Sequence, residues 1–312
     1  MKLSMVKCLE CGNDFDNDAG LHRHLRSHKL IMAAYYQKHY PRYDLYDKTY
    51  IRFKSKDYYF NTDFNSKANL KAWLQGVPQT QARDYLRTYL VNRKEKKNLT
   101  FAPCQVELRS LLIPGMRYFN ELFGSYYQLC DSIGYKLKFT KLAFYTEPKD
   151  IRHCKIIIDT RERLPLSFNL PSKVDTLKFG DYKLDNENFT CNLHIERKSL
   201  PDFYGTLSNG FDRFKRELFR AQEAGAYIVV LVESDFESIS KFTHMPHVKG
   251  KVSIAPEFIF RNMRDIIAEF PNLQFLFVNG RDEAVRVIEK VFASNCEYRE
   301  LDLQYAYDTG VL

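Results

Sequence analysis

Short apolar runs in the second half of the chain constrain its fold more than any other feature. Four of them have the length and composition of buried strands: Lys155–Thr160, Asn192–Ile195, Tyr227–Val232 and Phe275–Val278. Apolar residues at helical spacing predict helices in three other segments: Phe211–Ala224, Phe258–Phe270 and Arg281–Phe292. Because strands and helices alternate, this half is predicted to be an α/β domain with a mixed sheet.

Acidic residues stand at or just after the ends of the predicted strands. The four are Asp159, Glu162, Asp181 and Glu196. Side chains at neighbouring strand ends can converge, and hard divalent cations such as Mg2+ need several oxygen ligands. One or two such ions activate water and stabilise the leaving oxygen of a phosphodiester. The acids therefore predict a metal-dependent nuclease site.

The residues around Glu196 predict which side chains share a face of the sheet. Alternation along a strand places Glu196 and Lys198 on one side and Arg197 on the other. We expect Glu196 on the metal, Lys198 on the attacking water or the phosphate charge, and Arg197 beside a neighbouring acid. The alternative is an ordinary surface ion pair between Glu196 and Lys198, with Asp159 as a helix or turn cap.

Three ordered motifs of this half resemble the XPF-type nuclease family. They are Asp159-Thr160-Arg161-Glu162, Gly180-Asp181-Tyr182, and Glu196-Arg197-Lys198 continuing to Asp202. The resemblance implies a restriction-endonuclease-like fold over residues 150–295, cleavage of DNA, and dependence on Mg2+ or Mn2+. Its implied catalytic residues are Asp159, Glu162, Asp181, Glu196 and Lys198. The implied magnesium ligands are Asp181 and Glu196, with Asp159 in addition. Three further residues are expected to support them: Arg161, Arg197 and Asp202.

The sequence departs from that family after the nuclease motifs. Its relatives usually carry a tandem helix-hairpin-helix there, whereas residues 296–312 are predicted to be a C-terminal tail. Specificity for branched DNA is therefore in doubt. The family also pairs its nuclease domains, which is consistent with a homodimer through this domain.

The first thirty residues carry the spacing of a metal site. Cys8 and Cys11 form a C-x2-C pair, and after twelve intervening residues His24 and His28 form an H-x3-H pair. Zinc takes four such ligands in a tetrahedron, and histidines four apart share one helix face. Two apolar residues complete the pattern: Phe15 and Leu21. Residues 1–30 thus resemble a Cys2His2 ββα zinc finger with structural Zn2+. The alternative is two free thiols beside two surface histidines.

The finger has few residues with which to read bases. Alignment of Leu21 and His24 on the finger family puts the base-facing positions at Asn17, Gly20 and Arg23. Gly20 has no side chain, so Arg23 is the expected base contact, and a nearby arginine, Arg26, is expected to meet phosphate. One finger spans only ~3 base pairs. A structural or protein-binding finger is therefore the alternative.

Residues 31–100 are predicted to be a basic, aromatic-rich linker and helical region. The stretch Ala33–Asp57 interleaves Tyr with Lys and Arg. That composition suits a surface that stacks on nucleic acid and equally suits a small aromatic core with a basic rim. Helical spacing predicts helices at Leu70–Leu74 and Thr80–Arg93.

Residues 101–148 are predicted to form a helix-turn-helix-like module of three short helices. The first lies around Gln105–Leu112, the second opens after Pro114 and ends at Gly124, and the third runs from Ser125 to near Gly134. The segment resembles the helical repeat found beside nuclease domains in homing endonucleases. The resemblance implies three DNA contacts from the second helix: Arg117, Tyr118 and Asn120. A spacer without DNA contact is the alternative.

Charge assigns the nucleic acid to the first half of the chain. Residues 1–150 carry 25 Lys and Arg against 15 Asp and Glu, whereas residues 151–312 carry 22 against 24. Double-stranded DNA is the expected partner. No apolar run suits a membrane span or a signal peptide, and the seven cysteines are scattered. We expect a reducing compartment without a disulfide framework, either the cytoplasm or, in a eukaryote, the nucleus.

Three functions are consistent with these features. The first is a Mg2+-dependent endonuclease, of a phage or mobile-element homing type, that cuts a defined double-stranded site. The second is a structure-specific nuclease that acts on flaps or junctions in repair or recombination. The third is not an enzyme but a DNA-binding regulator whose nuclease-like domain serves for dimerisation.

Overall fold

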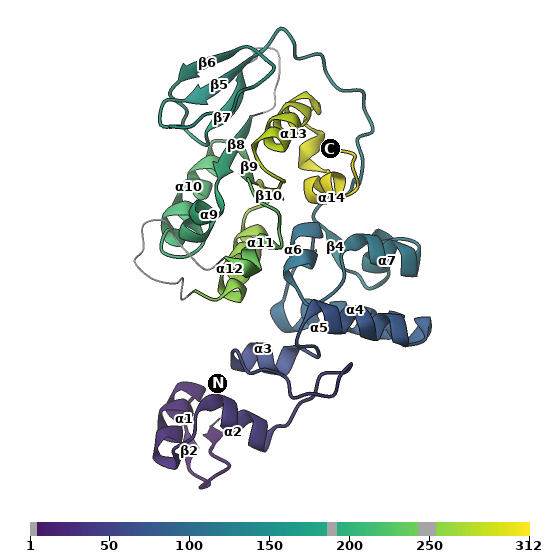
Figure 1. Cartoon of the computed structure of the whole chain (residues 1–312), viewed down its shortest axis with the longest axis vertical. Helices are drawn as coiled ribbons and strands as arrows, with labels where there is room; N and C mark the ends of the chain where they lie inside the picture. Colours follow the sequence, from purple (N-terminus) through teal and green to yellow (C-terminus); the bar gives the residue numbers. More distant parts are fainter. Residues whose placement is uncertain (1–4, 186–191, 243–253) are drawn as a thin grey trace. The chain divides into compact units, whose positions relative to one another are not determined.

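The computed structural model describes residues 5–185, 192–242 and 254–312 and divides the chain into two compact units (Figure 1). The first unit comprises Met1–Asp84 and Leu112–Pro114. The second comprises Tyr85–Leu111 and Gly115–Leu312. The predicted helical module therefore belongs mainly to the same unit as the predicted nuclease domain.

The first unit opens with a hairpin followed by a helix. β1 (Val6–Lys7) pairs antiparallel with β2 (Asp14–Phe15), and α1 (Asp18–His24) continues as the 3-10 turn η1 (Leu25–His28). The Asn17 side chain caps α1 by accepting a hydrogen bond from the Gly20 N–H at 3.0 Å. The ββα order expected of residues 1–30 is present.

Three helices follow in the first unit: α2 (Met32–His39), α3 (Lys56–Asn61) and α4 (Lys67–Gly76). The first two share a core with the hairpin and α1, which contains Cys8, Leu21, Leu25, Tyr35, Tyr36, Ile51 and Tyr59. The aromatic residues of Ala33–Asp57 thus divide into two groups. Some fill this core, whereas Tyr43, Tyr46 and Tyr50 are about half exposed, at 49%, 51% and 52%.

A long helix that starts in the first unit leads into the second, where three short helices lie at the predicted positions. α5 (Gln79–Lys97) is followed by α6 (Gln105–Ser110), α7 (Met116–Phe123) and α8 (Tyr126–Ser132). A two-stranded parallel pair, β3 (Phe101–Ala102) with β4 (Lys136–Leu137), frames the last three. The Ser125 side chain caps α8, as expected, and Gly124 ends α7 with a φ of 81°.

A six-stranded mixed sheet forms the centre of the second unit, in the order β10-β9-β8-β7-β5-β6. The strands are β5 (Lys155–Asp159), β6 (Ser172–Asp175), β7 (Tyr182–Asp185), β8 (Leu193–Lys198), β9 (Tyr227–Val232) and β10 (Leu273–Phe277). β7 is antiparallel to both of its neighbours, β5 and β8, whereas β8, β9 and β10 are parallel. The predicted mixed sheet is confirmed.

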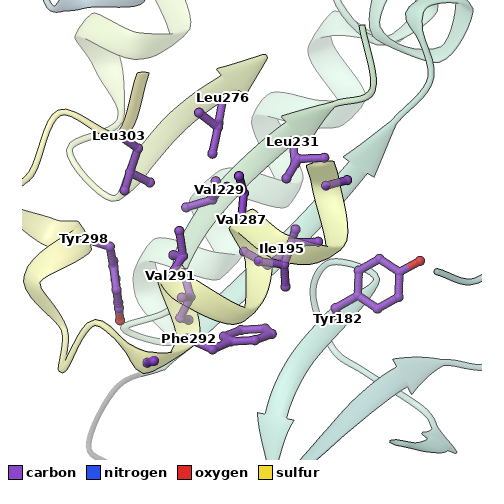
Figure 2. Packing of buried hydrophobic residues seen from close by; sticks show 14 of the residues in the cluster. Tyr182, Ile195, Val229, Leu231, Leu276, Val287, Val291, Phe292, Tyr298 and Leu303 are labelled. Carbon is purple, nitrogen blue, oxygen red and sulfur yellow. The ribbon is translucent and has the colours of Figure 1, made fainter. Parts of the chain in front are cut away.

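Helices cover both faces of this sheet (Figure 1). One face packs against α9 (Leu200–Thr206), α10 (Phe211–Glu223) and α12 (Pro256–Glu269), near the short α11 (Ser238–Lys241). The other packs against α13 (Arg281–Ala293), η2 (Glu297–Arg299) and α14 (Leu303–Asp308). Figure 2 shows Ile195 and Leu231 of the sheet meeting Val287 and Val291 of α13.

The predicted C-terminal tail, residues 296–312, is instead part of the core. Leu301, Leu303 and Ala306 are fully buried, and Asp302 caps α14 while accepting the N–H of Gln105 at 2.8 Å. Those apolar side chains cover a sheet face that would otherwise be exposed to water, which explains why the segment is ordered.

Two further sequence expectations concern cysteines and membranes. No disulfide framework was expected; Cys296 is disulfide-bonded, and Cys191 lies outside the described residues. Within the described residues, no helix has the length and hydrophobicity needed to cross a bilayer.

Candidate active site and metal cluster

Strand β8 sorts the motif side chains onto two faces of the sheet. Leu193 and Ile195 pack into the core beneath α13. Because side chains alternate along a strand, Arg197 lies on the same face as Leu193 and Ile195. Glu196 and Lys198 lie on the opposite face, which α10 covers. The Lys198 ammonium donates to the Glu196 carboxylate, and both side chains are more than four-fifths buried. An exposed surface ion pair, the alternative reading, does not fit this burial.

Gly180 brings the second acid to this position. Its φ is +63°, and a Cβ built there would lie 2.8 Å from the Ile195 carbonyl oxygen, so the backbone of β8 leaves room only for glycine. The next residue, Asp181, donates its N–H to that same carbonyl at 2.7 Å. Its Oδ2 accepts the N–H of Arg197 at 2.7 Å. These two bonds hold Asp181 beside the part of β8 that carries Glu196.

Asp181 precedes β7 rather than following a strand. We expected it at a strand end, which is true only of Asp159, the last residue of β5. Because β7 runs antiparallel to β5, the start of β7 lies beside the end of β5, and the Asp159 N–H donates to the Asp181 carbonyl at 2.9 Å. Asp159, at the end of β5, and Asp181, just before β7, therefore lie at the same edge of the sheet although the two strands run in opposite directions.

The electrostatics of the site reflect uncompensated negative charge. Burial, together with the nearby Glu196 carboxylate, raises the pKa of Asp181 to about 7. Burial would lower the pKa of Lys198, but Glu196 and Asp181 outweigh it, so that pKa is raised and the ammonium stays charged. One buried lysine thus faces two buried carboxylates.

This donor set fits a hard divalent cation. Asp181 Oδ1 and Glu196 Oε2 have no hydrogen-bond partner among the described residues, so each offers an oxygen ligand. Mg2+ is commonly held by one or two carboxylates, with water and substrate phosphate completing its shell. In residues 5–185, 192–242 and 254–312 the acids do not gather three ligand atoms at one point. Asp181 and Glu196 each keep an oxygen available to a cation, and the larger set that includes Asp159 and Glu162 stays a prediction.

Asp159, expected as a magnesium ligand, is hydrogen-bonded within the protein. Its side chain is 1% exposed and accepts hydrogen bonds from the Leu177 N–H at 2.7 Å and from the main chain and side chain of Arg161. Both oxygens are occupied, so coordination would require breaking these bonds. The carboxylate instead positions Arg161, whose side chain remains 69% exposed.

Glu162, expected to be catalytic, is engaged by an arginine in this structure. It forms a two-point ion pair with Arg197, at 3.0 and 3.1 Å, and Arg197 also contacts Glu233 at 2.8 Å. The three side chains are 8%, 12% and 9% exposed. Burial raises and Arg197 lowers the pKa of Glu162, and the net shift is downward. Arg197 therefore faces neighbouring acids, as alternation along β8 predicted, on the face away from Lys198.

Asp202, expected to support the site, lies in the first turn of α9. Its N–H and carboxylate both bond the Ser199 hydroxyl, which caps that helix. The Ser-x-x-Asp spacing followed by a helix already carries this signal in the sequence. Its carboxylate accepts a hydrogen bond from the Ser199 hydroxyl just after the end of β8.

Sequence reasoning missed Glu217, which α10 brings to the site. Burial first and the charge of Glu196 second raise its pKa. Glu217 has helical spacing to Arg213 and Arg220, and neither arginine makes an ion pair within the described part of the chain. A helix that alternates acids and arginines beside a predicted strand was the available signal, but spacing alone does not say which face meets β8.

The first unit holds the second candidate metal centre. The ligand atoms of Cys8, Cys11, His24 and His28 all lie within 4.8 Å of one another. Cys8 Sγ is 3.7 Å from His28 Nε2, Cys11 Sγ is 3.2 Å from His24 Nε2, and the two Nε2 atoms are 3.0 Å apart. A tetrahedral zinc site needs edges of roughly 3.3–3.8 Å, from metal–ligand bonds of about 2.0–2.3 Å. The Cys8–His28 separation lies within this range and the other two are slightly shorter, so the four residues have the donor set and approximate geometry of a tetrahedral metal site.

The residues expected to contact DNA differ in their exposure and in the partners they already have within the protein. Arg23, Arg26 and Arg117 are exposed, and Arg117 pairs with Glu121 along its own helix. Tyr118 is partly buried. Asn120 is committed within the protein, since its amide donates to the Tyr305 hydroxyl at 3.1 Å and its oxygen accepts the Tyr126 N–H at 2.7 Å. The side chain of Asn120 thus ties the helical module together, and its expected DNA contact stays a prediction.

Known proteins resemble the second unit. Residues 158–291 match the ERCC4 domain family. The structure of XPF from Aeropyrum pernix is 17% identical, with a TM-score of 0.34, and the match covers 44% of this chain and 63% of that chain. The same protein in complex with DNA is 16% identical, with a TM-score of 0.32, covering 47% and 64%. The chain thus spans less than two thirds of either structure.

No curated protein sequence matches the chain. The ERCC4 match, which includes the motifs around Asp159, Asp181 and Glu196, supports a DNA nuclease domain at residues 158–291.

Proposed function

We propose that the chain is a divalent-metal-dependent DNA endonuclease whose centre is Asp181, Glu196 and Lys198. The observation that carries this proposal is the buried pair of carboxylates with a buried lysine on one face of β8. Burial and the neighbouring Glu196 carboxylate raise the pKa of Asp181, because its ionised form is unfavourable there. A bound cation would stabilise the ionised form.

Asp181 and Glu196 would hold Mg2+ or Mn2+, which supplies Lewis acidity and an activated water for phosphodiester hydrolysis. The chain's own residues do the rest. Lys198 keeps a positive charge beside the carboxylates, where it can neutralise a phosphate oxygen or orient water. Arg161, held by Asp159 and exposed, presents a second cation at the same edge.

The arginines of α10 suit the flanking DNA backbone. Arg213, Arg216 and Arg220 are exposed and make no ion pair with the described residues. Unpaired guanidinium groups beside an acidic centre attract phosphates that the acids alone would repel.

The four ligands of the first unit support a structural zinc finger that positions DNA. Zinc would supply folding free energy to this small segment. Its capacity to read sequence is limited, because the Asn17 side chain caps α1 and Gly20 has no side chain. Asn17 and Arg23 are both exposed, but only Arg23 is not used as a helix cap, so it is the main expected base contact of the finger. Recognition of a defined duplex site, as in homing endonucleases, therefore rests on few contacts.

A structure-specific nuclease that acts on flaps or junctions is the second candidate. It is favoured by that small number of base contacts, since such an enzyme recognises shape and strand ends more than sequence. A DNA-binding regulator without cleavage activity is disfavoured, because none of the three motifs lacks an acid.

The test is cleavage of a random-site duplex pool beside flap and junction substrates, with Mg2+ or Mn2+. We expect cutting by the unmodified chain and none by Glu196→Gln, with DNA binding retained. Preferential cutting of flaps would select the second candidate. DNA binding without cutting of any substrate would overturn the proposal in favour of the regulator.

A further inference from the structure

Two exposed tyrosines of the first unit form a ring pair at the base of a loop. Tyr43 and Tyr50 face each other across an antiparallel bridge, with ring centroids 4.8 Å apart and planes inclined by 32°. The Tyr43 hydroxyl donates to that of Tyr50 at 3.4 Å. Both rings remain about half exposed, at 49% and 52%.

Hydrogen bonds hold the loop between Tyr43 and Tyr50 in place. Asp44 is completely buried and accepts the N–H groups of Tyr46 and Asn65, at 2.9 and 2.6 Å, and the Asn69 amide at 2.8 Å. The Asn69 amide also reaches Asp47 at 3.0 Å. These bonds fix the loop without using either ring, so the rings are held in place before any partner arrives.

The ring pair has no role in the core of the first unit. Tyr35, Tyr36 and Tyr59 supply the buried aromatic packing there, at 2% exposure or less. Large rings cost free energy when left in water, and exposed aromatic groups on a rigid support are typical of binding sites.

The charges around the pair suit a polyanion. Lys48 and Arg52 are exposed and form no ion pair with the described residues, and Arg52 has no side-chain partner there. The two acids of the segment between residues 43 and 54, Asp44 and Asp47, are both engaged in the hydrogen bonds of the loop. Flat rings with neighbouring cations match the bases and phosphates of a single nucleic-acid strand.

We infer that Tyr43 and Tyr50 form a platform on which an unpaired base of a DNA strand stacks, with Arg52 and Lys48 on its phosphates. The platform adds unpaired nucleotides to the substrate class of the proposed nuclease. It does not depend on cleavage, since it lies entirely in the first unit. A failure of the platform and a failure of the nuclease proposal are therefore separable.

The experiment measures binding of the full-length, zinc-loaded chain to a labelled oligothymidylate and to a blunt duplex, without added Mg2+. The Tyr43→Ala/Tyr50→Ala double variant should bind the single strand about tenfold or more weakly, because stacking is lost. Its affinity for the duplex should stay unchanged. Quenching of 2-aminopurine placed in the single strand should also be lost.

Two matched double variants separate stacking from other causes. Tyr43→Phe/Tyr50→Phe keeps both rings and should bind like the original chain, whereas Tyr43→Leu/Tyr50→Leu keeps apolar bulk but should behave like the alanine variant. Tyr145→Ala removes a ring that is 73% exposed in the second unit and should change nothing. Equal loss on single strand and duplex, or leucine variants that bind normally, would overturn the inference. So would unchanged single-strand binding by the alanine variant.

Salt dependence gives an independent readout. Arg52→Ala should lower the slope of log affinity against log salt by about one, because one phosphate contact releases about one counterion. The tyrosine variants should leave that slope unchanged. If a tyrosine variant lowered the slope as Arg52→Ala does, the rings would act by positioning the basic side chains on phosphates. That result would contradict stacking.

Discussion

The N–H of Arg197 donates to Oδ2 of Asp181 over 2.7 Å, so the strand that carries Glu196 also orients the other acid of the site. One residue of β8 therefore has two duties. Its main chain sets the direction of Asp181, and its guanidinium binds Glu162 and Glu233 on the opposite face. Arg197 therefore connects Asp181 of the candidate site to the buried ion cluster that it forms with Glu162 and Glu233.

Asp181→Asn should stabilise the metal-free protein at pH 8 while abolishing cleavage. The pKa of Asp181 is raised from 3.8 to about 7, so between these values the folded state binds more protons than the unfolded state. Its contribution to stability is present below pH 3.8 and is lost as pH rises through 7. Asparagine carries no charge, so we expect a gain of about 1–3 kcal/mol at pH 8 and none at pH 4. Thermal unfolding without divalent ions measures this. A lower melting temperature for the variant at pH 8 would contradict a strained, charged Asp181.

Gly180→Ala should disrupt the site, and Gly225→Ala provides the control. Both glycines have φ near +64°, but a Cβ meets the Ile195 carbonyl at 2.8 Å only at Gly180 and has nothing within 4 Å at Gly225. Both variants incur the conformational cost of about 1 kcal/mol. Gly180→Ala should lose about 2 kcal/mol more, together with cleavage activity, because β7 must move away from β8. Urea unfolding and a nuclease assay test this, and equal effects of the two variants would refute the close-approach argument.

Arg197→Leu should be strongly destabilising. It leaves Glu162 buried at 8% exposure without its ion-pair partner, and Glu233, at 9% exposure, with only Arg281 at 3.6 Å among the described residues. Removing one partner of a buried ion cluster costs about 3–5 kcal/mol. Arg117→Leu breaks the ion pair with Glu121, in which both side chains are exposed, at 83% and 60%, and should cost under about 1 kcal/mol. The comparison requires chemical denaturation at neutral pH. Similar losses in the two variants would mean that the cluster contributes no more than a surface pair.

Acid should destabilise the second unit through His194. Burial lowers the pKa of His194 from 6.5 to about 4, with Lys183 acting in the same direction. As pH falls from 6.5 to 4, the unfolded chain gains a proton that the folded chain excludes, so stability is lost across that window. The largest loss from this residue is about 3 kcal/mol. Unfolding curves across this pH range should show a shallower slope for His194→Gln, and an unchanged slope would reject the assignment.

Loss of zinc should affect more than the finger. Cys8 is fully buried in the same core as Tyr35, Tyr36 and Tyr59. Cys8→Ser should therefore lower the zinc content by one ion per chain and loosen this aromatic core, seen as weakened near-ultraviolet circular dichroism. The strands of the second unit should keep their hydrogen-exchange protection. An intact tyrosine core in the zinc-free variant would show that the metal stabilises residues 5–28 alone.

Features that depend on near neighbours in the chain were predictable. The alternation of β8 separates Glu196 and Lys198 from Arg197, and the spacing of Cys8, Cys11, His24 and His28 brings four ligands together. The end of α7 at Gly124 and the start of α8 at Ser125 were predictable as well, since caps are local interactions.

The partners of each charged side chain depended on the tertiary structure. Asp159 and Glu162 follow the family motif in sequence, yet Leu177, Arg161 and Arg197 occupy their oxygens. A carboxylate binds whichever donor the fold brings nearest, and that donor can lie far away in sequence. For the same reason no local pattern announces that Glu217 joins the site or that residues 296–312 complete the core: both follow from which faces of the helices meet the sheet.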